Sequence, residues 1–465
     1  MKKDIPFALL PLLALLTLLH GAPVRAQTAA ELSDQMRQMQ AAMNAMQIKL
    51  QELESKQAAE PQGLTPEQQR QLNRTTVRGE ALEEAQETMG FKGLKISGLI
   101  DPSYVYSQGQ NRAGFQFLNS AQNGEYAYDN GAFGMAILDF QKEFEGGSKF
   151  RLTLAPNRGG GGIAIDGQSI VHEASVSIPL GNLQTRFIAG QIPDWSGYEV
   201  MQANQNRLVS HNLLFDFTLP AVYTGAGLDL QRSPWSIKVL LANVNSSRKN
   251  SGQKMPALAY RVDFYDYKRE FNGWGFAGVH GKLANWRSTD PAGNPVSGQP
   301  YASDDTLVHA FEIDGFFSRG DWTLGGQIGV GMQRQAAISA NALSGELQDS
   351  QWWGISTMAA YKLTPQLELV ARLDYLNNSK NGGGALGYSF ADSRNGLGPD
   401  LLGDAQRGAN RSALALGGRY QFNTSTQFKV EYRVDRADLP VFLHKGSEQF
   451  QRNNQMLATS VVMSF

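Results

Sequence analysis

The last twelve residues of the chain alternate between larger apolar positions and smaller or more polar ones. In Asn454–Phe465 one face carries Leu457, Thr459, Val461, Met463 and Phe465. Successive side chains of a β-strand point to opposite faces, so this period indicates a strand between two different environments. A chain that stops on an aromatic residue after such a strand is typical of a β-barrel closed by its last strand. The edge strand of a soluble sheet would show the same period.

The period of two extends back to residue 91 and predicts about sixteen strands. Within 426–437, for example, Phe428 and Val430 interleave with Lys429 and Glu431, which gives the strand one apolar and one polar face. The predicted strands are 92–107, 132–145, 148–156, 168–180, 183–193, 221–232, 235–245, 257–270, 273–288, 304–318, 321–335, 350–363, 366–378, 410–422, 426–437 and 454–465.

Short turns alternate strictly with long loops between these strands. The short ones, such as Glu145–Gly147 and Phe271–Asn272, are rich in turn-forming residues. The long ones are 108–131, 157–167, 194–220, 246–256, 289–303, 336–349, 379–409 and 438–453. A soluble sandwich has no reason to sort its connections in this way. The pattern therefore predicts an all-β fold, an antiparallel transmembrane β-barrel over 91–465 with short periplasmic turns and long external loops.

The first ninety residues follow other patterns. Lys2 and Lys3, an apolar stretch and a small-residue site at Ala26 predict a signal peptide over 1–26. Residues 27–57 carry an apolar seam spaced four and three, which predicts an α-helical coiled coil. Residues 58–90 form a polar linker, with a helix predicted from Pro66 to Met89. The sequence leaves open whether this helix is a periplasmic spacer or enters the barrel.

Composition narrows the chemistry. The 465 residues contain no cysteine, which excludes disulfides, cysteine-ligated metals and thiol nucleophiles. The formal net charge is −1 and no basic stripe is present, so nothing points to nucleic acid as a partner. No phosphate-binding loop, nucleophile elbow or metal-spaced histidine pair occurs in the sequence. We therefore expect no cofactor, no bound metal and no enzymatic activity.

Five segments carry a resemblance to a known family: Gly98–Tyr104, Gly134–Lys142, Leu154–Arg158, Gly190–Glu199 and His211–Gly225. They resemble a Gram-negative outer-membrane porin-like family of the OmpL type. The coiled coil before a barrel is also similar to trimeric carbohydrate- and phosphate-type porins. The resemblance implies a homotrimer in contact with outer-membrane lipid, with its coil in the periplasm, and passive diffusion of ions and small hydrophilic solutes. It also implies that the barrel-assembly machinery reads a C-terminal signal made by Leu457, Val461, Met463 and Phe465.

The long connection 194–220 is the candidate pore-narrowing element, because the corresponding loop of general porins folds into the barrel. It offers Asp194, Glu199, Arg207 and His211 as lining side chains, unless it lies outside as a lid. Period two also turns charged strand residues inward, and the candidates among them are Arg151, Arg186, Arg261, Asp263, Glu312, Asp314, Arg372 and Arg433. Because opposite charges nearly balance, we expect weak ion selectivity or a rigid lattice of ion pairs. The alternative function is a plugged barrel that tethers the envelope through the coil.

Overall fold

The computed structural model describes residues 44, 49, 70–71, 73–77, 90–117, 134–155, 170–245, 255–266, 272–285, 287, 305–386, 397–400 and 402–465. The chain divides into two compact units, Met1–Lys92 and Gly93–Phe465. In the first unit residues 44, 49, 70–71 and 73–77 are helical. The predicted signal peptide and most of the predicted coiled coil and polar helix lie outside the described residues. None of the helices described here is both long enough and apolar enough to cross a membrane.

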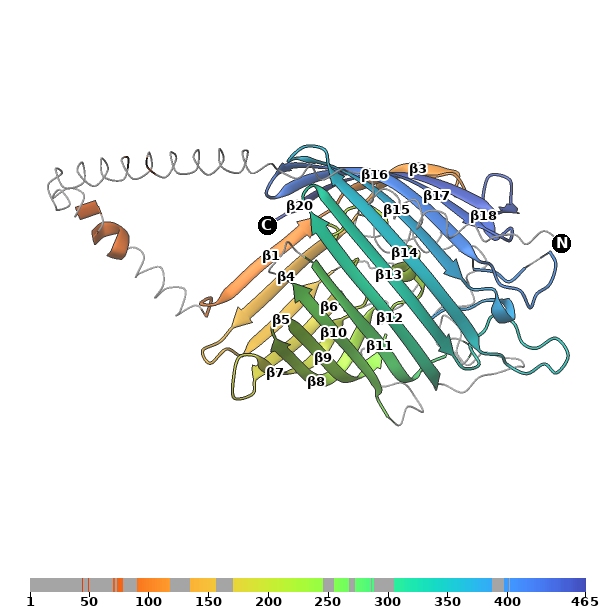
Figure 1. Ribbon diagram of the computed structural model, residues 1–465, viewed down its shortest axis with the longest axis horizontal. Coiled ribbons are helices and arrows are strands. Elements are labelled where there is room, and N and C mark those ends of the chain that lie inside the picture. The colour runs from red at the N-terminus through yellow and green to blue at the C-terminus, as the bar shows by residue number, and fades with distance from the viewer. Residues whose placement is uncertain are drawn as a thin grey trace, which may run out of the picture. The chain divides into compact units, whose positions relative to one another are not determined.

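The second unit is a single antiparallel sheet that closes on itself (Figure 1). Its strands are β1 (Leu94–Ile100), β2 (Ser103–Ser107), β3 (Arg112–Gln116), β4 (Ala136–Glu143), β5 (Lys149–Leu154), β6 (Val171–Pro179), β7 (Thr185–Pro193), β8 (Val222–Arg232), β9 (Trp235–Val244), β10 (Ala257–Asp266), β11 (Asn272–Ala284), β12 (Asp305–Arg319), β13 (Trp322–Gln333), β14 (Ser350–Lys362), β15 (Leu367–Asn377), β16 (Arg411–Asn423), β17 (Thr426–Ala437) and β20 (Asn453–Ser464).

At two positions around the barrel, one place in the wall is occupied by two successive strands. We call each such place a line of the wall. β2 continues β1 past Asp101 and Pro102, and both pair with β20, which closes the ring. On the neighbouring line β2 pairs with β3 and β1 pairs with β4, so that β4 continues β3. The eighteen strands of the sheet therefore make a closed barrel of sixteen lines, which confirms the predicted fold class and strand number.

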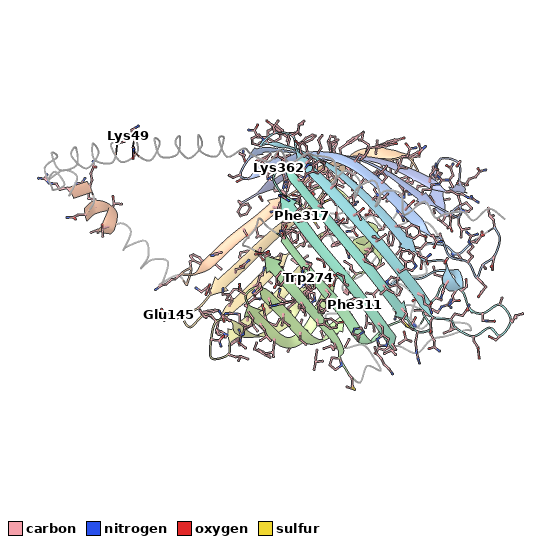
Figure 2. All side chains as sticks on the ribbon, in the orientation of Figure 1. Lys49, Glu145, Trp274, Phe311, Phe317 and Lys362 are labelled. Carbon is pink, nitrogen blue, oxygen red and sulfur yellow. The ribbon has the colours of Figure 1, made fainter. Side chains whose placement is uncertain are left out.

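The two faces of the wall differ as the period of two predicts. In β17 Val430 and Tyr432 are exposed on the outer face, whereas Lys429, Glu431 and Arg433 are buried on the inner face. Three tryptophans that directly follow short turns, Trp235, Trp274 and Trp322, are also exposed. Figure 2 shows Trp274 with Phe311 and Phe317 on strands that face the viewer.

The long connections contain structure that the sequence pattern missed. The predicted loop 108–131 is wrong for residues 112–116, which form β3 and start the second line of the wall. Loop 194–220 contains helix α4 (Leu213–Phe217), and loop 379–409 contains the 3-10 helix η2 (Lys380–Gly382). Loop 438–453 contains the hairpin of β18 (Phe442–His444) and β19 (Gln449–Gln451). These elements are too short for periodicity to reveal them.

Candidate functional site

Residues 194–220, here called the inserted loop, lie against the inner face of the wall rather than outside it as a lid. The loop leaves the end of β7 and returns at the start of β8. Its side chains and backbone contact inward-facing residues of strands β12 to β17. Asn212 caps α4 by accepting hydrogen bonds from the backbone N–H groups of Leu214 and Phe215. The alternative that the sequence left open is thereby decided.

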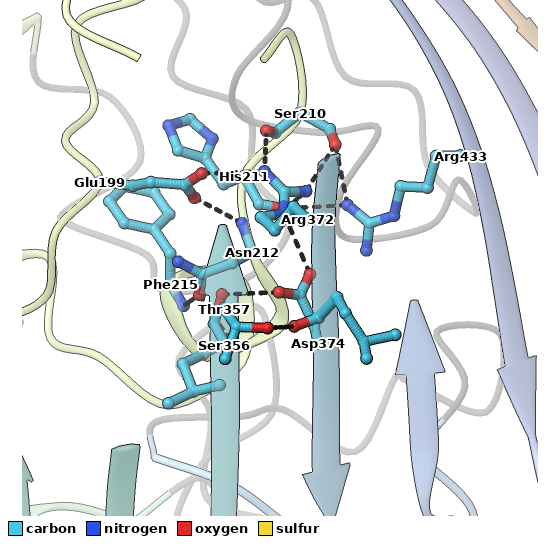
Figure 3. Close-up of polar contacts among 12 residues, drawn as sticks. Glu199, Ser210, His211, Asn212, Phe215, Ser356, Thr357, Arg372, Asp374 and Arg433 are labelled. Carbon is cyan, nitrogen blue, oxygen red and sulfur yellow. Dashed lines mark hydrogen bonds and ion pairs between the residues drawn. The ribbon is translucent and has the colours of Figure 1, made fainter. Parts of the chain in front are cut away.

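A group of three wall residues, here called the anchor, holds the centre of the loop: Glu431, Arg372 and Arg433. Figure 3 shows the two arginines beside Ser210 and His211. The Glu431 carboxylate accepts hydrogen bonds from the N–H groups of Val209 and Ser210 at 2.8 and 2.7 Å and from the Ser210 hydroxyl at 2.5 Å. All three anchor side chains are 0% exposed. The carboxylate therefore accepts the hydrogen bonds of loop donors that have no access to water.

The two arginines of the anchor bind the carbonyl groups of the same segment. Arg372 donates to the carbonyl oxygens of Ser210 and His211, both at 2.7 Å, and Arg433 donates to that of His211 at 2.8 Å. Arg372 also forms an ion pair of 2.9 Å with Glu199 of the loop. The guanidinium fork presents several donors in fixed directions. These contacts therefore fix the position of the loop as well as attract it to the wall.

Glu199 and His211 are two further candidates, and they tie the loop to itself. Glu199 accepts a hydrogen bond of 2.6 Å from the N–H of Asn212. The His211 Nε2–H donates to the carbonyl of Val200 at 2.8 Å, and its ring stacks on Phe215 at a centroid distance of 4.0 Å. Burial lowers the pKa of His211 to about 4, which keeps the ring neutral at physiological pH.

Two loop carboxyls are buried with unequal numbers of partners. Asp194 accepts hydrogen bonds from the Tyr223 hydroxyl at 2.5 Å and from Ser196, and burial raises its pKa to about 6. Asp216 lies 4.0 Å from Arg433, and no hydrogen bond reaches its Oδ2 from the described residues. Burial raises the pKa of Asp216 to about 7. The loop therefore contains one carboxyl that titrates near neutral pH.

Two apolar side chains of the loop pack against glycines of the inner wall. A Cβ atom at Gly417 of β16 would lie 2.6 Å from Leu208, and one at Gly354 of β14 would lie 3.0 Å from Leu214. Leu208 and Leu214 are 2% and 0% exposed. Packing this close leaves no room for a larger wall residue. Period two cannot show this feature, because glycine carries no side chain to alternate.

A second buried cluster holds the start of the inserted loop, and it contains four of the predicted candidates. Arg261 of β10 pairs with Asp263 at 2.7 Å, with Glu312 at 3.2 Å and with Asp314. Glu312 in turn accepts a hydrogen bond of 2.5 Å from the N–H of Gly197 in the loop. Arg207 contacts Glu368 at 3.3 Å on β15, the strand that also carries Arg372. Loop candidates and strand candidates are thus parts of one connected network.

Arg151 and Arg186 lie elsewhere, on the wall formed by β1 and β4 to β9. Arg151 pairs with Asp139 at 2.8 Å and with Glu173 at 3.4 Å. Arg186 donates to the Ser177 hydroxyl and to the carbonyl of Gly147, both at 2.6 Å. Unlike the anchor, the side chain of Arg151 is 40% exposed. Its surroundings are therefore open to water.

A recess of about 870 Å³, including its open mouth, lies along this second wall. Its polar lining includes Lys95, Arg151, Glu173, Asp229 and Lys238, and Trp195 of the inserted loop closes one side. The Lys238 ammonium lies 5.8 Å from the centre of the Trp195 ring, within reach of a cation–π contact. Glu173 and Trp195 were not among the sequence-predicted site residues. Period two could have found Glu173, because it places this residue on the same face as Ser175 opposite Arg151.

The arrangement can hold a loop inside a polar barrel and leave an aqueous space beside it. Among the described residues, no three His, Asp or Glu side chains are placed to hold a metal ion together. The fold and the site define a porin-like β-barrel with an inserted loop.

The family follows from the sequence. Residues 62–465 match the model of a family described as protein of unknown function (DUF3138), and the chain belongs to this family. No curated protein matches the sequence. The description of the family assigns no activity, and the OmpL-type similarity remains a resemblance.

Solved structures share the fold at low sequence identity. One is an anion-selective porin from Comamonas acidovorans, with 9% identity and a TM-score of 0.50 over 80% of this chain and 99% of that chain. Another is the outer-membrane channel DcaP of Acinetobacter baumannii, with 12% identity and a TM-score of 0.48 over 80% and 97% of the two chains. OmpT, an outer membrane protein of Vibrio cholerae, shows 11% identity and a TM-score of 0.49 over 80% and 97%.

Proposed function

We propose that this protein is an outer-membrane porin through which ions and small hydrophilic solutes diffuse passively. The observation that carries the proposal is a closed sixteen-strand barrel whose inner wall is polar and whose longest described loop folds inward. An aqueous lumen explains why charged side chains face inward while apolar ones face outward.

The path for solutes runs along the recess and not past the anchor. Arg372 and Arg433 are fully buried under the inserted loop, so they hold the loop in place rather than touch the solute. The recess instead presents five basic side chains (Lys95, Lys142, Lys149, Arg151 and Lys238) and three acidic ones (Glu143, Glu173 and Asp229). The acidic residues offset most of the positive charge, which supports weak ion selectivity.

The remaining parts of the proposal concern assembly. The protein forms a homotrimer in contact with outer-membrane lipid, and its N-terminal coiled coil lies in the periplasm. The barrel-assembly machinery recognises the C-terminal strand through Leu457, Val461, Met463 and Phe465. The exposure of Leu457, Val461, Met463 and Phe465 on the outer face of β20 is consistent with such recognition. Deletion of Phe465 should lower the fraction of heat-modifiable barrel in outer-membrane preparations.

Single-channel conductance in a planar bilayer tests the proposed porin function. The full protein should give stepwise currents, in groups of three if it is a trimer, with a small reversal potential under a salt gradient. A variant in which residues 199–216 are replaced by a short Gly-Ser linker should conduct more, because the lumen is no longer filled. A folded barrel that never conducts, with or without the loop, would contradict the porin and leave the envelope tether as the function.

Charge reversal tests the path. Lys238→Glu should shift the reversal potential toward cation selectivity, because Lys238 lines the recess. Arg319→Glu is the matched control, since Arg319 lies at the short turn after β12 and in register with the outward-facing Trp322. Equal shifts in the two variants would show that the recess is not the path.

A further inference from the structure

Two histidines meet on the outer face of the barrel, on the other side of the wall from the inserted loop. His280 of β11 and His309 of β12 are direct cross-strand partners. Their chain neighbours Val279 and Val308 are buried inside, so the two imidazoles project outward together with Phe311. The Nδ1 atoms of the two rings lie 3.1 Å apart. We call His280 and His309 the histidine pair.

A third residue orients the pair. The Tyr260 hydroxyl of β10 lies 3.2 Å from the His280 Nε2, on the side of the ring away from His309. When the Nε2–H donates to the tyrosine oxygen, the lone pair of the His280 Nδ1 points toward His309. Metal-binding histidines are commonly held in this way, with the second ring nitrogen bonded to a neighbouring oxygen. The Tyr260 ring also stacks beside His280, at a centroid distance of 5.7 Å.

We propose that the histidine pair binds one divalent transition-metal ion, of the class of Zn²⁺, Ni²⁺ and Cu²⁺, through both Nδ1 atoms. Metal–nitrogen bonds are about 2.0–2.1 Å long. Two such bonds across the observed gap of 3.1 Å enclose an angle of about 100°, which lies between the square-planar and tetrahedral values. The spacing of the two nitrogens therefore fits a single ion with only a turn of the rings, and water completes the coordination. Imidazole nitrogen is a preferred ligand for these metals.

The position of the pair along the wall gives ions access to it. Along the outer face of β11 the next position toward the long loop is Lys282, which is exposed and charged. On β12 the position on the other side of His309 is Phe311. The histidine pair thus lies between the aromatic position Phe311 and the charged position Lys282, and His309 is exposed there. A site at this border is open to water and does not share residues with the proposed solute path.

Calorimetric titration of the purified protein in detergent, without a histidine tag, tests the site with Zn²⁺ and Ni²⁺ as probes. We expect one equivalent per chain. His280→Ala and His309→Ala should each abolish this binding step, and Tyr260→Phe should weaken it by roughly 10- to 100-fold because both ligands remain but lose their orienting partner. His444→Ala is the control, since His444 lies in the separate hairpin of β18 and β19.

Electron paramagnetic resonance of bound Cu²⁺ provides an independent readout. Nitrogen couplings from two imidazoles should appear in the wild type and fall to one in either single variant. Unchanged binding in His309→Ala, or equal loss in His444→Ala and His309→Ala, would overturn the proposal. Because none of these variants alters the recess, conductance should stay at the wild-type value, and failure of the metal site would leave the porin function untouched.

Discussion

Replacing Glu431 by glutamine removes the negative charge from the contact that holds the inserted loop. In the wild type its two carboxylate oxygens accept three hydrogen bonds from Val209 and Ser210. Glutamine keeps one oxygen of similar shape and places an NH₂ group where the second oxygen was. That NH₂ group cannot accept a hydrogen bond, so at least one loop donor is left buried without a partner.

The size of the effect follows from these contacts. A hydrogen bond to a charged group contributes about 1.5–3 kcal/mol, and leaving its donor unsatisfied costs a similar amount. We take a loss of about 3 kcal/mol, which lowers the ratio of docked to released loop by roughly 100-fold. The strands of the barrel keep their own hydrogen bonds, so the expected change is local to the loop and the barrel stays folded.

Trypsin reports the released loop directly. Arg207 is the one lysine or arginine in residues 194–220, so cleavage of the released loop divides the chain at a known point. Glu431→Gln should be cut at Arg207 roughly 100 times faster than the wild type when cleavage follows opening. Asp139→Asn is the matched control, because Asp139 is also a buried inner-wall acid but contacts Arg151 instead of the loop. If Glu431→Gln and the wild type are cut at the same rate, Glu431 does not hold the loop.

Two other predictions concern the same loop. Gly417→Val should increase cleavage and conductance, because a Cβ there would lie 2.6 Å from Leu208; Gly418→Ala, whose nearest contact is at 3.6 Å, should change neither. Asp216 alone should also weaken docking about fourfold from pH 6.5 to 8. Its pKa of about 7 in the docked loop is raised from 3.8, whereas the loop residues Asp194 (about 6) and His211 (about 4) are mostly unprotonated over this range. A raised pKa favours docking at low pH and loses its effect as the pH rises through 7. Asp216→Asn should therefore flatten the pH dependence of cleavage relative to the wild type, and an unchanged dependence in this variant would refute the assignment.

The local alternation of residues was sufficient to predict the barrel, because each wall strand has apolar residues on its outer face and polar residues on its inner face. β17 shows this directly, with exposed Val430 and Tyr432 alternating with buried Glu431 and Arg433. β3 was not predicted because it is only five residues long, Arg112–Gln116. It is also separated from its continuation β4 by residues 117–135. An interruption inside one line of the wall cannot be distinguished from a loop by periodicity.

The candidate site was predictable in its positions but not in its partners. The alternation with a period of two correctly placed Arg372 and Arg433 on the inner face, because the face of a residue depends only on its neighbours in the strand. Their partner Ser210 is 162 positions from Arg372 and 223 from Arg433, so the contacts depend on the path of the loop through the barrel. The sequence could not separate the exposed recess from the buried anchor, so the expected weak ion selectivity stays a prediction.

The anchor also predicts how two substitutions combine. Burying charged groups costs desolvation energy, so an ion network stabilises its position only when every member is present. Arg372 and Glu431 both contact Ser210, and their closest charged atoms are 3.9 Å apart. Arg372→Met leaves Glu431 buried without this neighbouring cation, and Glu431→Gln leaves Arg372 buried with Glu199 and Asp374 but one opposite charge fewer. The double variant removes both charges, so its cleavage at Arg207 should be well below the product of the two single effects. Multiplicative effects in this double-mutant cycle would mean that the two residues hold the loop independently of each other.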